Sequence, residues 1–139
     1  MKNLITSNSV NIKELSLNQI LVRGLYTPSL NKQIQSQFKI SLPENNLQIN
    51  QDKNIICSKN SFDQWSIILF QQLELEIDNI IDKINENKKA LATNYSEGQI
   101  YLEISGENKI FILNKITHFD FREKYFPLSS SAQTLIGRV

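Results

Sequence analysis

The chain has 139 residues, of which 40% are hydrophobic and 21% are charged, a composition that fits a globular protein and excludes an intrinsically disordered one. The net charge of +1 gives no electrostatic reason to expect a nucleic acid or an anionic membrane as partner. The single cysteine, Cys57, excludes an internal disulfide and a four-cysteine zinc site. No apolar run approaches the ~20 residues that span a bilayer, and the cytoplasm is the expected compartment.

The N-terminal third predicts one strand and one helix. Residues 1–11 form a mostly polar start that we expect to be flexible. Residues 19–24 are an apolar, β-branched run that ends in glycine, which is typical of a strand. A short helix is predicted after Pro28, with Ser29 as its N-cap and one apolar stripe, which consists of Leu30, Ile34 and Phe38.

The middle of the chain predicts a loop, a hairpin and a long helix. Residues 41–53 are rich in Asn, Gln and Asp around a proline and predict a surface loop. The apolar runs 54–59 and 64–70 predict the two strands of a hairpin. Residues 72–88 predict an amphipathic helix, because apolar side chains recur at helical spacing, namely Leu73, Ile77, Ile80, Ile81 and Ile84.

The C-terminal third predicts two strands at 90–95 and 99–105, a helix at 106–116 that begins at Ser105 or Gly106, and a strand at 132–139. Strands and helices alternate without a strict β-α-β rhythm. The fold class predicted by these elements is therefore α+β, with a mixed or antiparallel sheet and helices packed on one face.

A search for catalytic chemistry finds no convincing constellation. His118 is the only histidine, and Asp120 and the serines at 129–131 near it invite a triad. Sequence proximity does not give triad geometry, however, and no GxSxG elbow presents a serine. One histidine and one cysteine do not make a zinc site, and Cys57, inside an apolar strand, is interpreted as a buried, inert thiol. We therefore predict no catalytic, cofactor-binding or metal-binding residue in this chain.

Five residues are candidates for a structural or subunit-interface role. Arg23 is a charge at the end of an apolar strand, which calls for a buried ion pair or a contact to another chain. Trp65 is either a core residue or an interface anchor. Glu97 is either a ligand or base, or a turn residue. His118 and Phe121 lie in an aromatic turn, where Asp120 is expected to accept hydrogen bonds from nearby backbone N–H groups.

A series of short motifs runs along the chain in a fixed order: Arg23-Gly24, Leu42-Pro43, Asp63 with Trp65, Ser96 with Gly98, Leu102 to Gly106, Asp120, Phe126, and Ala132 to Leu135. From about residue 12 to residue 139, this series resembles the gamma subunit of heterotetrameric sarcosine oxidase. Two departures from the family pattern are the turn "NSFDQW" at 60–65, where the family has a GPDEW-like turn, and "ITHFDF" at 116–121, where it has a CPLDL-like turn.

The resemblance implies a single domain over 12–139, or two small lobes divided near residue 90, with a fold like that of the folate-binding aminomethyltransferases. It implies an accessory, non-catalytic gamma subunit whose partners are alpha, beta and delta subunits. Such a complex demethylates sarcosine to glycine oxidatively, transfers the one-carbon unit to tetrahydrofolate and produces hydrogen peroxide. FAD, FMN, NAD, tetrahydrofolate and zinc are held by the other subunits.

Two alternatives stay open at the level of sequence. One is a stand-alone folate-binding or aminomethyltransferase-like module, in which Glu97 or Glu103 would hold the pterin ring. That alternative rests on the implied fold alone, which is analogy and not evidence from a site. The other is a non-catalytic α+β adaptor without a ligand.

Overall fold

The computed structural model describes residues 2–6, 9–70 and 76–137, and it divides the chain into two compact units. One unit comprises Met1–Ser16 and Ile100–Val139, and we call it the sheet-A unit. The other comprises Leu17–Gln99, and we call it the sheet-B unit. The assignment of residues 12–139 to one domain stays a prediction.

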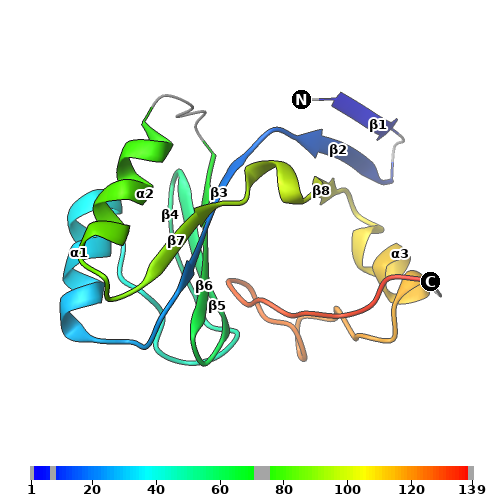
Figure 1. The fold of residues 1–139 in the computed structure, drawn as a ribbon. Helices are drawn as coiled ribbons and strands as arrows, with labels where there is room; N and C mark the ends of the chain where they lie inside the picture. Colours follow the sequence, from blue (N-terminus) through cyan, green and yellow to red (C-terminus); the bar gives the residue numbers. More distant parts are fainter. Residues whose placement is uncertain (1, 7–8, 71–75, 138–139) are drawn as a thin grey trace. The chain divides into compact units, whose positions relative to one another are not determined.

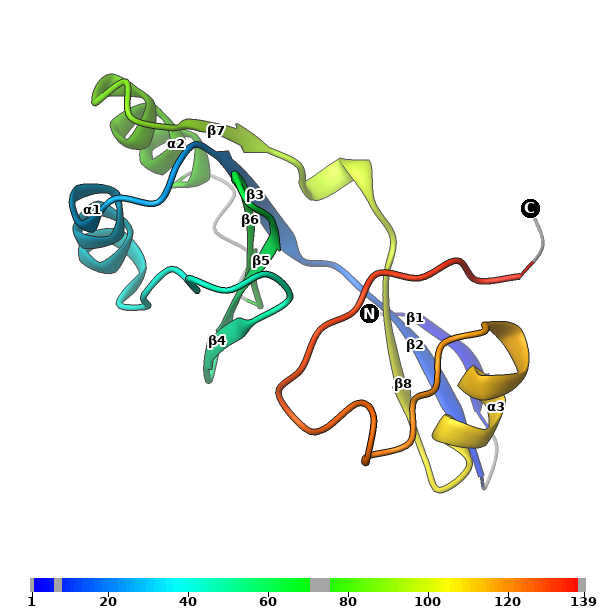
Figure 2. The same ribbon diagram turned by 90° about the horizontal axis from the view of Figure 1, so that it is seen from below.

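The sheet-B unit is a five-stranded antiparallel sheet with two helices (Figures 1 and 2). Its strand order is β4-β5-β6-β3-β7, and α1 and α2 cover the same face of the sheet. The elements are β3 (Asn18–Arg23), α1 (Pro28–Phe38), β4 (Ile49–Asp52), β5 (Ile55–Ser61), β6 (Gln64–Leu69), α2 (Ile77–Glu86), β7 (Leu91–Asn94) and the 3-10 turn η1 (Ser96–Gly98).

The hydrophobic core of this unit lies between the sheet and its two helices. Leu30, Ile34 and Phe38 of α1 are buried, as their predicted stripe required, and Trp65 of β6 is fully buried at 0% exposure. Side-chain hydrogen bonds join the layers. The Gln33 amide donates to a carbonyl of α2 at 2.8 Å. The Asn85 side chain accepts from Ala92 N at 2.7 Å and donates to Ala92 O at 3.1 Å, which joins α2 to β7.

The sheet-A unit is a three-stranded antiparallel sheet, in the order β1-β2-β8, with one helix. Its elements are β1 (Lys2–Thr6), β2 (Asn11–Leu15), β8 (Tyr101–Ser105) and α3 (Lys109–Ile116). Ile5, Ile12 and Ile104 face one another across the three strands on one face of the sheet. Leu102 lies on the same face of β8, opposite Glu14. The other face carries the ion pair between Lys13 and Glu103, at 3.7 Å.

The structure confirms the predicted α+β class, with two antiparallel sheets and three α-helices among the described residues. The strand at 19–24, the helix after Pro28, the hairpin and the helix at 106–116 are all present. The N-cap of α1 is Thr27, whose hydroxyl accepts from Leu30 N at 3.1 Å, and not Ser29. Asn108, and neither Ser105 nor Gly106, precedes α3.

Three expectations about secondary structure are wrong in part. Residues 2–6, expected to be irregular, form β1 and pair with β2. Residues 41–53, expected to be a loop, contain β4, which pairs with β5. The described residues of the predicted strand 132–139 form no strand, although Gly137 N donates to Ile116 O at 2.7 Å. The start of the predicted helix at 72–88, including Leu73, lies outside the described residues, and α2 begins at Ile77.

None of the helices in the described part of the chain has the length and apolar content that a bilayer crossing requires.

Candidate interaction surface

Helix α3 is the first component of a candidate surface in the sheet-A unit. Its sequence, KIFILNKI, is apolar on most sides, yet none of its residues is buried. A soluble helix that is hydrophobic around most of its circumference is normally a core element. Phe111 is 60% exposed and Ile116 is 40% exposed. Helix α3 therefore presents apolar side chains that its own unit does not cover.

The rest of the sheet-A unit also has few buried residues. Among the residues of this unit whose burial the structure describes, only Val10 and Thr117 are buried. Large patches of exposed apolar surface on a protein are typical of interaction sites. The exposed large apolar side chains of this unit are Leu4, Ile5, Ile100, Leu102, Phe111, Ile116, Tyr125, Leu128, Leu135 and Ile136.

The segment after α3 folds around three phenylalanines. The ring centroids of Phe119 and Phe121 are 5.0 Å apart, and Phe126 lies 5.4 Å from each of them. All three pairs meet edge to face, the favourable arrangement for aromatic quadrupoles. This cluster gives the segment an apolar centre in the absence of regular secondary structure.

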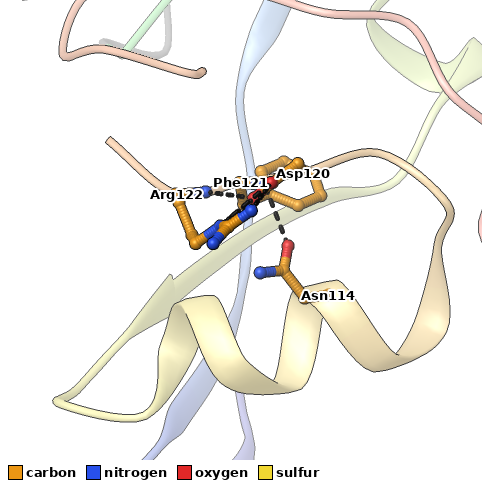
Figure 3. A network of polar contacts seen from close by, with 4 residues as sticks. All are labelled: Asn114, Asp120, Phe121 and Arg122. Carbon is orange, nitrogen blue, oxygen red and sulfur yellow. Dashed lines mark hydrogen bonds and ion pairs between the residues drawn. The ribbon is translucent and has the colours of Figure 1, made fainter. Parts of the chain in front are cut away.

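Polar contacts fix the backbone between these rings (Figure 3). The Asn114 side chain on α3 accepts from Phe121 N at 2.8 Å. Asp120 accepts from Arg122 N at 3.0 Å, which confirms its predicted role toward the backbone, and it also accepts three bonds from the Arg122 guanidinium at 2.6, 2.9 and 3.0 Å. The hydrogen bonds from Arg122, with its positive charge, lower the pKa of Asp120. The same side-chain hydrogen bonds, with the negative charge of Asp120, raise the pKa of Arg122.

An apolar cavity of about 390 Å³ opens between α3 and this aromatic segment. Ile110 and Leu113 of α3 form one wall, and Phe121 and Phe126 form the other. Lys109 and Glu123 also line it, together with the serines at 129 and 130. A hollow of this size and polarity can accept one or two apolar side chains from another protein chain.

The predicted interface residues do not gather at one place. Phe121 is half-buried in the aromatic cluster and lines the cavity, whereas His118 is exposed in the turn. Arg23 is exposed, donates to Gln64 Oε1 at 3.2 Å and forms no ion pair with another described residue. The alternative, a contact to another chain, stays a prediction. Trp65 is a core residue of the sheet-B unit, and Glu97 is exposed in η1.

The structure defines the surroundings of the groups that were considered for chemistry. His118 makes no side-chain hydrogen bond or ion pair with any described residue. Glu103 is engaged with Lys13 on the polar face of sheet A. No group of three or more His, Cys, Asp or Glu side chains that could hold a metal occurs among the residues that the structure describes.

Cys57 is buried in β5, and burial raises the pKa of its thiol from the ordinary value of 9.0 to about 12. We expect the native chain to resist thiol-labelling reagents at mildly alkaline pH, and to react once it is unfolded. As the pH rises, the Cys57 thiol of the folded chain keeps its proton after the thiol of the unfolded chain has lost its proton. The thiol therefore contributes stability below pH 9.0, which is lost as the pH rises toward about 12. Cys57→Ser should abolish the labelling of the unfolded chain. Rapid labelling of native wild-type protein would contradict the burial of Cys57.

Sequence reasoning missed a buried lysine that anchors the segment before β4. Lys59 is only 8% exposed, its Nζ donates to Glu44 O at 2.6 Å, and it lies 5.4 Å from the centre of the Trp65 ring. The Trp65 indole N–H donates to Pro43 O at 2.9 Å. The available signal was a lysine inside an apolar strand, which has to find polar partners if it points inward.

Comparison with solved structures finds a likeness to a chain of a known enzyme complex. The chain aligns with a chain of the heterotetrameric sarcosine oxidase from Corynebacterium sp. U-96, solved in complex with pyrrole 2-carboxylate. The TM-score is 0.79 and the identity is 12%, over 96% of this chain and 69% of that one. No family model matches the chain, and no curated protein matches its sequence. The likeness therefore establishes a shared fold with a chain of that enzyme complex.

Proposed function

We propose that this chain is an accessory subunit, without an active site of its own, of a sarcosine-oxidase-type complex. The fold likeness to a chain of a heterotetrameric sarcosine oxidase, with a TM-score of 0.79 over 96% of this chain, is the observation that carries the proposal. Because a fold by itself does not determine a function, a second and independent observation is needed. The uncovered apolar surface of the sheet-A unit supplies it, since permanent subunits bury such surfaces against each other.

The finer assignment is to the gamma subunit, with alpha, beta and delta chains as partners in the cytoplasm. It is supported by the collinear series of short motifs from Arg23-Gly24 to the segment at 132–135. In this proposal the complex oxidises sarcosine to glycine, passes the one-carbon unit to tetrahydrofolate and releases hydrogen peroxide. FAD, FMN, NAD, tetrahydrofolate and zinc are bound by the other chains, and this chain contributes assembly surface.

A charge placed on α3 should prevent assembly. Phe111 is 60% exposed on α3, and Phe62 is 69% exposed in the turn between β5 and β6. Phe111→Glu puts a carboxylate into the proposed interface, where an unpaired buried charge costs several kcal/mol. The new glutamate lies four residues before Lys115, a spacing that supports a helix. The variant should therefore keep its fold.

The experiment is co-purification of a tagged chain from its natural host, with flavin absorbance as the readout. Wild type and Phe62→Glu should both carry flavin-bearing partner chains in fixed proportion, whereas Phe111→Glu should lose them. Circular dichroism of the three purified chains controls for folding. Equal retention of partners by Phe111→Glu and wild type would exclude α3 from the interface.

A further inference from the structure

A polar cleft of about 320 Å³ lies in the sheet-B unit. Its lining comes from the region around the start of α1 and from the segment that leads from α1 into β4 (Figure 2). Most of the lining side chains are polar and uncharged, and the exceptions are Leu42 and Glu44. Binding clefts usually have an apolar lining with a few polar groups. A cleft lined by amides and one carboxylate therefore favours a small, polar ligand.

Hydrogen bonds to the main chain hold the walls of this cleft in place. The Asn31 side chain accepts from Leu42 N at 2.8 Å, and the Asn50 side chain donates to Ser41 O at 2.9 Å. Lys59 Nζ donates to Glu44 O from the buried side. Leu42 beneath the cleft is 2% exposed. The cleft is thus preformed, which reduces the ordering that a ligand would have to impose.

Hydrogen bonds at the cleft also determine which atoms of the Asn45 and Asn50 side-chain amides remain available to a ligand. Gln48 Oε1 accepts from both the backbone N and the side-chain Nδ2 of Asn45, at 3.2 and 3.3 Å. The nitrogen of the Asn45 amide is therefore engaged, and its Oδ1 is left as an acceptor. For Asn50 the nitrogen is engaged with Ser41 O, and again Oδ1 remains. Two carbonyl oxygens at this cleft therefore accept no hydrogen bond from the described residues.

The charge at the cleft is negative. One carboxylate oxygen of Glu44 accepts from the Tyr26 hydroxyl at 3.3 Å, and the carboxylate forms no ion pair within the described part of the chain. Burial and the neighbouring Glu44 raise the pKa of Tyr26, which keeps its hydroxyl a donor. The nearby cation, Lys59, does not line the cleft, and its Nζ donates to the Glu44 carbonyl instead.

We propose that this cleft binds a small organic ammonium compound, whose N–H groups donate to the Glu44 carboxylate and to the side-chain carbonyls of Asn45 and Asn50. An ammonium group has three donors and no acceptor, and the lining of the cleft offers the two side-chain carbonyls and the carboxylate of Glu44, which already accepts one bond from Tyr26. A divalent metal fits less well, because Ca²⁺ takes six or more oxygens, commonly from several carboxylates. The residues of this site all belong to the sheet-B unit, whereas the residues proposed for assembly belong to the sheet-A unit.

The test uses two probes of similar size on the full chain, ethanolamine in its ammonium form and ethylene glycol, followed by NMR titration of the amide signals. Ethanolamine should bind saturably and shift signals of residues 41–50, and ethylene glycol should bind about tenfold more weakly, because a charge-assisted hydrogen bond is lost. This comparison needs no variant and so does not depend on the folding of a mutant.

Two variants then locate the charge. Glu44→Gln keeps the shape of the side chain and should weaken ethanolamine binding about tenfold. Glu97→Gln removes an exposed carboxylate of η1 and should leave ethanolamine binding unchanged. The absence of saturable binding to wild type, equal binding of the two probes, or an unchanged affinity in Glu44→Gln would each overturn the proposal. Partner co-purification is measured separately, so failure here would leave the assembly role intact.

Discussion

Replacement of Trp65 by alanine is expected to destabilise the sheet-B unit by about 3–5 kcal/mol, the range for truncating a large buried aromatic side chain. Trp65 is 0% exposed in the centre of the core. Its loss would leave a cavity, and it would also remove the hydrogen bond to Pro43 O and the ring that lies beside the Lys59 ammonium. Urea unfolding followed by far-UV circular dichroism measures the change in the free energy of unfolding.

Trp65→Phe separates the packing from the hydrogen bond. It keeps an aromatic ring in the core but leaves Pro43 O without its donor, so we expect a smaller loss of about 1–3 kcal/mol. A Trp65→Ala variant as stable as wild type would show that the sheet-B core is not organised around this side chain.

Gly106→Ala is expected to disrupt the sheet-A unit. Gly106 has φ of +107°, and a Cβ added there would lie 2.4 Å from the Ser9 carbonyl oxygen. That carbonyl also accepts from Asn108 N at 3.1 Å, so its displacement would loosen the start of α3. Backbone strain and the steric clash together should cost about 3 kcal/mol. Hydrogen exchange of the β2 and β8 amides, read by mass spectrometry, should become faster.

Gly137 provides the matched control for this substitution. Its φ is +74°, also in the region that favours glycine, but a Cβ added there meets nothing within 4 Å. Gly137→Ala therefore carries the conformational cost without the clash, and it should change the exchange of β2 and β8 much less. Equal effects of the two substitutions would rule out the close approach to Ser9 as the cause.

The sequence predicted elements well where local periodicity was strong. The stripe of Leu30, Ile34 and Phe38 fixed α1, and two apolar runs separated by a short turn fixed the hairpin of β5 and β6. These signals are local, because each helix face or hairpin is specified by neighbouring residues.

The failures concern strand pairing, which is local in sequence for β1 and distant in sequence for β7 and β8. Strand β1 consists of five residues with no clear alternation, and it exists because β2 pairs with it. β7 and β8 are neighbours in sequence, yet β7 pairs with β3 and β8 pairs with β2, in two different sheets. Such partners are chosen by tertiary packing, and the local pattern of a strand does not encode them.

The candidate sites illustrate the same limit. The segment around His118 was a candidate site because it holds the only histidine of the chain. In the structure, its centre is formed by the packed rings of Phe119, Phe121 and Phe126. The exposure of α3 could not be read from its sequence, because an apolar helix looks the same whether its own domain or another chain covers it. The cleft near Glu44 depends on which amide ends are engaged, which only the hydrogen bonds define.

The most direct test of the accessory role is the mass of the native assembly. The chain, tagged and expressed at its natural level in its own host, should be recovered in a hetero-oligomer of fixed stoichiometry that carries flavin and oxidises sarcosine. The chain released from that assembly should be inactive toward sarcosine. Recovery of wild-type protein only as a lone monomer, without flavin-bearing chains, would contradict the account.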